Sequence, residues 1–371
     1  MLDRNSHNFS AGPGALPDTV LEQLSAEMLS VPELGVSLLG ISHRSEWFES
    51  VVLEVEERLR NLLYLTEDWN VILMQGGSSL QFGMIPMNLL PAKGSADYLR
   101  TGYWSGRSIA DPRLFGSINL AWDGEPWEFR RLPRTEELQL NEQAAYFHYV
   151  SNETVEGLQF QQIPGIDGVT RICDMSSDFL SRPIAIKNYD LIYAHAQKNL
   201  GPAGLTIVLI RDSLLERLQR PVPTMLDYRN HRDHQSIFNT PPTFAIYATL
   251  LVLRWLENTV GGLRTMEKCN KRKAMKVYGM VDESDGFYMG RAARDDRSLM
   301  NVCFNLEDKL LEPIFLQEAT KQGFEGLKGH RSIGGMRASL YNAVSESACE
   351  DLCELMTNFR IKHRKGRVQK W

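Results

Sequence analysis

Lys198 has the surroundings of a reactive amine. It lies in the segment 193–204, between two apolar runs, 189–193 and 205–210, that are typical of short buried strands. No acidic residue in that segment or in the following run pairs with its charge. Loss of solvation would lower the pKa of such a lysine toward the neutral, nucleophilic amine that a Schiff base requires. A solvated loop lysine is the ordinary alternative, because lysines are rarely fully buried.

Ser78 and Ser79 stand where a phosphate could be held. They follow the glycine pair at 76–77, between a predicted strand at 71–74 and a predicted helix at 80–89. Glycines let backbone N–H groups turn inward, and a helix N-terminus adds positive potential, which together suit a phosphate. Neither a P-loop nor GxGxxG spacing is present. A plain strand-to-helix turn with a serine cap would explain the same residues.

Three more side chains follow predicted strands and could hold a planar ring. Trp104 could stack on the ring or fill core. Thr154 could hydrogen-bond a ring hydroxyl or close a turn. Asp174 could pair with a protonated ring nitrogen or cap a turn. These features follow one another along the chain, each at a strand end of one sheet: the phosphate-binding turn with Ser78 and Ser79, the aromatic ring of Trp104, the hydroxyl of Thr154, the acid Asp174 and the amine of Lys198. Together they predict a pyridoxal phosphate site in which the lysine forms the imine.

Two short segments gather arginines and histidines. Arginine is suited to a bidentate grip on phosphate and carboxylate groups, so a substrate that carries both would need such residues. Each arginine taken alone is better explained as a surface ion-pair partner, although the glycines around Arg331 and Arg337 keep the approach to them open. The residues concerned are His43, Arg44, His330, Arg331 and Arg337.

The composition narrows the class of protein. At 371 residues, 43% hydrophobic and 23% charged, the chain is typical of a globular protein of about two domains. A net charge of -5 argues against a general nucleic-acid binder. The first residues lack the apolar core of a signal peptide, and no window approaches a membrane span. Five scattered cysteines without a CxxC pair indicate reduced thiols and no metal site. We therefore expect a cytoplasmic protein with neither a nucleic-acid nor a membrane partner.

Strands alternating with helices predict an α/β fold with a mainly parallel sheet flanked by helices, whose ligands bind at the carboxyl ends of the strands. After residue 243 a long helical region reaches about residue 281, and a smaller α+β domain follows it. The expected strands are 71–74, 96–99, 145–150, 169–173, 189–193, 205–210, 298–304 and 335–341. The expected helices are about 18–28, 46–63, 80–89, 104–111, 308–322 and 345–363.

Several segments, in order along nearly the whole chain, resemble the phosphoserine aminotransferase family of class V, fold-type I pyridoxal phosphate enzymes. The resemblance implies three parts: an N-terminal arm at 1–17 associated with the small domain and the active site, a large cofactor-binding domain at 18–262, and a small domain at 263–371. The matching segments are Phe9-Ser10-Ala11-Gly12-Pro13, Ser42-His43-Arg44, Gly76-Gly77 with Gln81-Phe82, Gly102-Tyr103-Trp104, Asn152-Glu153-Thr154, Ala196-Gln197-Lys198-Asn199, Phe238-Asn239-Thr240-Pro241-Pro242-Thr243 and Lys328-Gly329-His330-Arg331 through Gly334-Gly335-Met336-Arg337-Ala338-Ser339.

The resemblance also implies a role for each matching residue. Lys198 would bind pyridoxal 5′-phosphate as a Schiff base and then move the substrate proton. Asp174 would hold the ring nitrogen, Trp104 would stack on the ring and Thr154 would bind its hydroxyl. The cofactor phosphate would be held by Ser78, Ser79 and Gln197, together with Asn239 and Thr240 of the partner subunit in a homodimer. The substrate phosphate would lie among His43, Arg44, His330 and Arg331, some of them across the dimer interface, and the α-carboxylate on Arg337 with Ser10.

The activity that this resemblance implies is transfer of the amino group of L-glutamate to 3-phosphohydroxypyruvate, giving O-phospho-L-serine and 2-oxoglutarate. The family also suggests 4-phosphohydroxy-L-threonine as a second substrate. One alternative is another class V enzyme, such as an alanine–glyoxylate aminotransferase, which has no substrate phosphate to bind, or a cysteine desulfurase, which needs a mobile cysteine. A non-catalytic protein on the same fold would have lost Lys198, Asp174 or Arg337.

Three features depart from the family pattern. Some members carry arginine where this chain has Ser79, so the grip on the substrate phosphate would depend more on Arg44 and Arg331. His195 stands where glycine is expected, and we expect it to pack behind the strand rather than to crowd the site. The segment 111–131 looks shortened.

Overall fold

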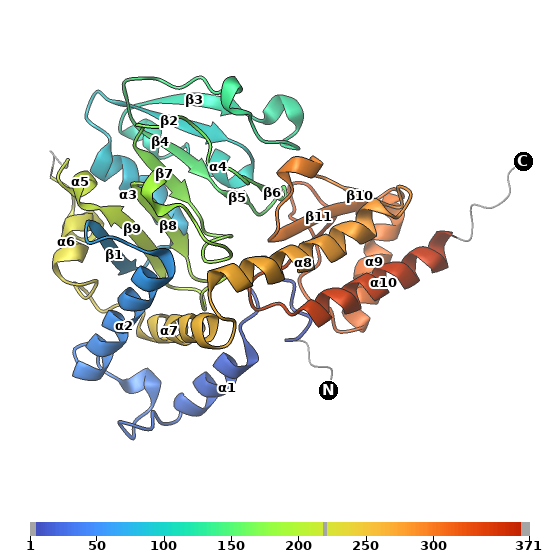
Figure 1. Cartoon of the computed structure of the whole chain (residues 1–371), viewed down its shortest axis with the longest axis horizontal. Coiled ribbons are helices and arrows are strands. Elements are labelled where there is room, and N and C mark those ends of the chain that lie inside the picture. The colour runs from blue at the N-terminus through green and yellow to red at the C-terminus, as the bar shows by residue number, and fades with distance from the viewer. Residues whose placement is uncertain (1–4, 218–220, 365–371) are drawn as a thin grey trace, which may run out of the picture.

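A seven-stranded sheet forms the centre of the computed structural model, which describes residues 5–217 and 221–364. The strand order is β1-β9-β8-β7-β4-β2-β3 (Figure 1). Only β9 runs against its neighbours, so all the other strands of this sheet end at the same edge. The strands are β1 (Trp69–Met74), β2 (Ser95–Arg100), β3 (Ser117–Asp123), β4 (Ala144–Val150), β7 (Arg171–Asp174), β8 (Leu191–His195) and β9 (Thr206–Arg211).

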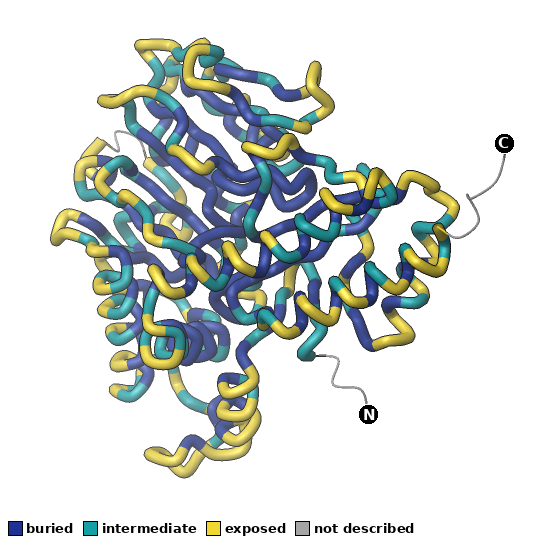
Figure 2. Tube along the Cα trace, turned by 45° about the vertical axis from the view of Figure 1, so that its right-hand side comes forward, coloured by how far each residue is buried: buried dark blue, intermediate teal, exposed yellow. Residues whose placement is uncertain are grey.

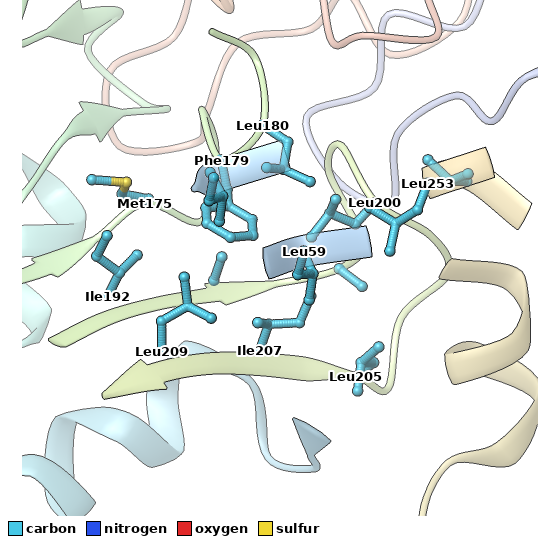
Figure 3. Close-up of a cluster of buried hydrophobic side chains, with 14 of the residues drawn as sticks. Leu59, Met175, Phe179, Leu180, Ile192, Leu200, Leu205, Ile207, Leu209 and Leu253 are labelled. Atoms are coloured by element: carbon cyan, nitrogen blue, oxygen red, sulfur yellow. The ribbon is translucent and has the colours of Figure 1, made fainter. Parts of the chain in front are cut away.

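Helices cover both faces of this sheet, because alternate strand residues point to opposite sides. In β9, Ile207 and Leu209 point toward the face that α2 and α7 cover, with α1 packed on α7. Leu59 of α2 lies beside Ile207 (Figure 3). Val208 of the same strand packs on the other face, toward α3, α5 and α6. These helices are α1 (Asp18–Glu27), α2 (Glu46–Leu63), α3 (Gly77–Leu89), α5 (Asp212–Leu215), α6 (Tyr228–Asp233) and α7 (Thr243–Asn258).

A second, smaller core lies beside the sheet. Helix α8 (Leu263–Asp282) begins in the large core and ends in the small one, as Figure 1 shows. The buried Phe9 joins this small core from the N-terminal arm. The division at 1–17, 18–262 and 263–371 remains a prediction, and this distribution of the cores supports it. The small core is built by β10 (Tyr288–Gly290), β11 (Asn301–Leu306) and β12 (Met336–Ser339), which form an antiparallel sheet, with α8, α9 (Glu312–Lys321) and α10 (Glu346–Arg364).

The expected α/β fold is confirmed, with local differences. Strand β3 lies inside the segment 111–131, where no strand was expected; it is an edge strand with half-exposed polar residues, so it lacks the apolar run of a central strand. The helical region at 243–281 is two helices, because Gly261 and Gly262 adopt φ of +85° and +87° between them. The expected helix at 104–111 ends earlier, as α4 (Tyr103–Arg107).

Buried residues concentrate in the sheet and the helix faces turned toward it (Figure 2). Within 5–217 and 221–364 no helix is both long enough and apolar enough to cross a membrane. Residues 1–4, which belong to the segment examined for a signal peptide, lie outside the described residues.

Candidate active site

The strand ends of the large sheet enclose one cavity. Strands β1, β2, β4, β7 and β8 are mutually parallel, so the loops that follow them meet at one edge. A two-stranded ribbon, β5 (Asn152–Glu153) and β6 (Leu158–Gln159), continues from β4 at this edge. Seven residues expected to bind the cofactor line the cavity: Ser78, Ser79, Trp104, Thr154, Asp174, Gln197 and Lys198.

The turn between β1 and α3 presents backbone N–H groups to this cavity. Gly76 and Gly77 both have positive φ, at +100° and +66°, and α3 begins at Gly77 rather than at Leu80 as expected. A Cβ on Gly76 would lie 2.3 Å from Cδ2 of Leu80, so a side chain there would displace the first turn. The N-terminus of α3, with Ser78 and Ser79 in its first turn, therefore opens onto the cavity as a site for an anion.

Lys198 is buried with its amine inside the cavity. Its Nζ donates a hydrogen bond to Oγ1 of Thr154 at 2.7 Å and lies 5.9 Å from the ring centroid of Trp104. Burial lowers the pKa of Lys198 to about 8, against the opposing effect of the Asp174 charge. Far more of this amine is therefore neutral near physiological pH than of an ordinary lysine, and the neutral form is the nucleophile.

Asp174 ends β7 on the floor of the same cavity. It is buried, and its Oδ1 accepts hydrogen bonds from the backbone N–H of Ser176 at 2.9 Å and from Oγ of Ser176 at 2.5 Å. Burial raises the pKa of Asp174, while the Ser176 bonds and the charge of Lys198 act in the opposite direction. Its carboxylate is placed to accept a proton-bearing ring nitrogen.

Two buried glutamates hold the short helix that carries Trp104. Oε2 of Glu153 accepts from the backbone N–H of Trp104 at 3.1 Å, and its Oε1 accepts from that of Ser105 at 3.0 Å. Oε1 of Glu156 accepts from the N–H of Tyr103 at 3.0 Å. Burial and the nearby Glu153 raise the pKa of Glu156 to about 8. Neither glutamate was expected at the site, although Glu153 stands beside Thr154 in a matching segment.

His195 does not pack behind the strand, and that expectation is wrong. It ends β8 and lines the cavity, with its Nδ1 2.7 Å from Oγ of Ser78. Because strand residues alternate between faces, the buried Ala194 and Ala196 pack in the opposite core and leave residue 195 on the cavity side. Burial and the charge of Lys198 lower the pKa of His195 to about 3, so its imidazole is neutral.

Some of the expected substrate residues lie near this cavity. Nη1 of Arg337 donates to the carbonyl oxygen of Thr154 at 3.3 Å. The ring of His330 lies 4.8 Å from that of Tyr103, the neighbour of Trp104. Burial and the charges of Arg337 and Arg331 lower the pKa of His330, so the three side chains act on one another.

The N-terminal arm that carries Ser10 packs against the same edge. The N–H of Gly14 donates to the carbonyl oxygen of Gln197 at 2.8 Å. A Cβ on Gly12 would lie 3.6 Å from Cγ of Lys198. The backbone N–H of Ser10 donates to Oδ1 of Asn8 at 3.1 Å, which fixes the arm locally.

Eight of the expected site residues do not line the cavity: Ser10, His330, Arg331 and Arg337, and also His43, Arg44, Asn239 and Thr240. Nδ2 of Asn239 donates to Oε1 of Gln75 at 3.0 Å, and Nε2 of Gln75 donates to the carbonyl oxygen of Thr240 at 3.2 Å. His43 and Arg44 lie at the start of α2, with Arg44 exposed. All eight belong to the described part of the chain, and their roles in binding remain predictions.

The chain matches known proteins over nearly its whole length. The family model for class V aminotransferases matches residues 6–352. A phosphoserine aminotransferase of Halalkalibacterium halodurans is 46% identical over 361 residues, covering 97% of this chain and 100% of the relative. One of Pseudomonas entomophila is 45% identical, covering 98% of this chain and 100% of the relative.

Solved structures agree with these relatives. A phosphoserine aminotransferase from Bacillus circulans subsp. alkalophilus superposes with a TM-score of 0.93 at 43% identity, covering 96% of this chain and 98% of its own. One from Trichomonas vaginalis, described as bound to pyridoxal phosphate, has a TM-score of 0.89 at 39% identity, covering 95% and 99%. An alanine–glyoxylate aminotransferase from Nostoc sp. shares the fold with a TM-score of 0.74 at 18% identity, covering 94% of each chain.

Fold and site thus define a class V, fold-type I aminotransferase, whose cofactor is pyridoxal 5′-phosphate. Within that class, the chain belongs to the phosphoserine aminotransferase family. The residues present fit the cofactor: a helix N-terminus opened by Gly76 suits its phosphate, and the carboxylate of Asp174 suits its ring nitrogen. Lys198, with a pKa near 8, suits its aldehyde.

Proposed function

We propose that this chain transfers the amino group of L-glutamate to 3-phosphohydroxypyruvate, giving O-phospho-L-serine and 2-oxoglutarate. One observation supports the reaction type. The amine of Lys198 is buried in the same cavity as Asp174 and the N-terminus of α3, and its Nζ lies 2.7 Å from Oγ1 of Thr154. The near-complete match to phosphoserine aminotransferases supports the substrate. 4-Phosphohydroxy-L-threonine belongs to the proposal as a second substrate.

Each residue has a task in the proposed reaction. When bound, pyridoxal 5′-phosphate supplies an aldehyde that captures amines and a ring that withdraws electrons from the substrate Cα. Lys198 Nζ would remove the proton from that Cα and deliver a proton to the aldehyde carbon of the bound cofactor, which its pKa of about 8 allows. Asp174 holds the proton of the ring nitrogen, since its carboxylate is fixed by Ser176.

Other side chains bind and orient. Trp104 lies over the amine of Lys198, on a helix fixed by Glu153, and is placed to stack on the ring. Ser78, Ser79 and Gln197 would hold the cofactor phosphate. The α-carboxylate would be gripped by Arg337 with Ser10, and the substrate phosphate by His330, Arg331, His43 and Arg44.

The proposal includes a homodimer with shared active sites. Asn239 and Thr240 would then act in the cavity of the partner, and some of His43, Arg44, His330 and Arg331 would reach the substrate phosphate across the interface; none of these residues lines the cavity of its own subunit. Large apolar side chains exposed near α1 support an interface: Leu29 is 83% exposed and Leu39 is 61% exposed. We also propose a cytoplasmic location, which the five unpaired cysteines support.

Comparison of paired substrates tests the proposal. The purified protein should turn over 3-phosphohydroxypyruvate with glutamate far faster than unphosphorylated hydroxypyruvate or glyoxylate. The expected ratio of kcat/KM is at least about 100-fold, because the site would lose its charge-assisted phosphate contacts. Equal rates on phosphorylated and unphosphorylated oxo acids would contradict the assignment and favour an enzyme of the alanine–glyoxylate type.

A further inference from the structure

A chain of hydrogen bonds runs along the wall of the cavity from His195 to Asp174. Nδ1 of His195 lies 2.7 Å from Oγ of Ser78, which lies 2.5 Å from Oγ of Ser176. Oγ of Ser176 lies 2.5 Å from Oδ1 of Asp174. All four residues line the cavity that contains Lys198. The roles derived above give His195 no part in the reaction.

Counting protons fixes the direction of this chain. Asp174 as a carboxylate only accepts, so Ser176 donates its single hydroxyl proton to it. The bond between the two serines must then use the proton of Ser78, whose oxygen is left to accept from His195. The imidazole is therefore the tautomer with its proton on Nδ1. A neutral ring, which the lowered pKa of His195 supports, makes it a hydrogen-bond donor rather than a counter-charge.

The other ring nitrogen shows that this arrangement has a cost. Nε2 of His195 is buried and has no hydrogen-bond partner among the residues that the structure describes. A buried polar atom left unpaired is destabilising, and in a native structure such an atom calls for an explanation. A glycine at this position would carry no such atom. The hydrogen bond between Nδ1 and Ser78 is the interaction that offsets the unpaired Nε2.

We infer that His195 is a positioning residue for the cofactor phosphate and acts through Ser78. Its Nδ1–H occupies a lone pair of the Ser78 oxygen, so the hydroxyl proton of Ser78 is directed into the cavity or toward Ser176. A phosphate at the N-terminus of α3 would accept a hydrogen bond from the Ser78 hydroxyl, while Ser176 keeps its own hydrogen bond to Asp174. Hydrogen bonds in series also polarise one another, which makes Ser78 a better donor.

This inference rests on the proposed assignment of Ser78 to the cofactor phosphate, and dissociation constants test both. Full-length protein freed of cofactor is titrated with pyridoxal 5′-phosphate and, separately, with pyridoxal, which lacks the phosphate; quenching of tryptophan fluorescence reports binding. The variants are S78A, H195A, H195N and the double variant S78A/H195A. Asparagine carries an N–H donor at the position of Nδ1, so H195N is the conservative control. Thermal unfolding of each variant shows that it is folded.

The expected Kd for pyridoxal 5′-phosphate rises roughly 10-fold or more in S78A and H195A, as loss of a hydrogen bond to a charged group implies. H195N stays within about 3-fold of the parent, and the double variant is no weaker than S78A alone. The Kd for pyridoxal is unchanged in all of them. An unchanged Kd in S78A would refute the phosphate assignment itself. A loss in S78A without one in H195A, an equal loss for pyridoxal, or additive losses in the double variant would overturn the inference about His195.

Discussion

The amine of Lys198 should titrate near pH 8, and acetic anhydride can measure this without the cofactor. Acetic anhydride is small and reacts only with neutral amines, so the rate of acetylation follows the unprotonated fraction. Burial lowers the pKa of Lys198 from 10.5 to about 8. We therefore expect its acetylation rate to rise with pH and to reach half of its plateau near pH 8.

The size of the effect follows from these two values. At pH 7 an amine with a pKa of 8 is about 9% neutral, and one with a pKa of 10.5 is about 0.03% neutral, a difference of about 300-fold. Removing the Asp174 charge should shift the midpoint of Lys198 further down, because that charge is what raises its pKa against burial. The variant Asp174→Asn therefore has a predicted midpoint below that of the parent protein.

The assay compares lysines within one molecule. Protein freed of cofactor is labelled at a series of pH values from 6.5 to 11 in about half-unit steps, and mass spectrometry of the peptides gives a rate for each lysine. The exposed Lys93 is the internal control. The pH of the midpoint is compared rather than the absolute rate, since burial also slows access of the reagent. A Lys198 rate that still increases tenfold per pH unit above pH 9, or a midpoint that rises in Asp174→Asn, would refute the reasoning.

Three further perturbations probe other parts of the account. Lys273 is buried and donates to the carbonyl oxygens of Leu340, Tyr341 and Val344 at 3.1, 2.8 and 2.9 Å. Because Lys273→Met leaves these oxygens unpaired, it should lower the free energy of unfolding in urea by about 3 kcal/mol. Lys268→Met, on the exposed face of the same helix, should change that free energy by less than about 0.5 kcal/mol. Glu153→Gln replaces one acceptor of the α4 N–H groups by a donor, so the Kd for pyridoxal 5′-phosphate should rise roughly 10-fold; an unchanged Kd would show that Trp104 needs no such support. Arg337→Gln should raise the KM for glutamate and for O-phosphoserine alike, by about 10-fold or more, and a selective effect on the phosphorylated substrate alone would assign Arg337 to the phosphate instead.

Residues at the ends of predicted strands could be placed from the sequence. Parallel strands bring their carboxyl ends to one edge, so Ser78, Thr154, Asp174 and Lys198 had to meet once the strands were recognised. Edge strand β3 was missed because it lacks the apolar run that marks a buried strand.

Partnerships between side chains were harder to predict. The position of His195 on the cavity side follows from the two-residue period of β8. Its hydrogen bond to Ser78 depends on where α3, which is distant in sequence, packs against that strand. The role of Glu153 required knowing that the α4 helix starts against β5. Contacts across an interface involve two chains, so the expected roles of Asn239, Thr240, His43 and Arg44 in a partner's site stay predictions.

The half-reaction with O-phospho-L-serine shows whether Lys198 and the bound cofactor transaminate a phosphorylated amino acid. Protein loaded with pyridoxal 5′-phosphate is mixed with O-phospho-L-serine in the absence of any oxo acid, and the visible absorbance of the cofactor is followed. We expect this absorbance to be lost in a single turnover, with release of 3-phosphohydroxypyruvate in stoichiometric amount. Addition of 2-oxoglutarate should then restore the spectrum. An unchanged spectrum with O-phospho-L-serine, or the same loss in Lys198→Ala at the rate of the parent protein, would contradict the proposed function of this chain and of Lys198.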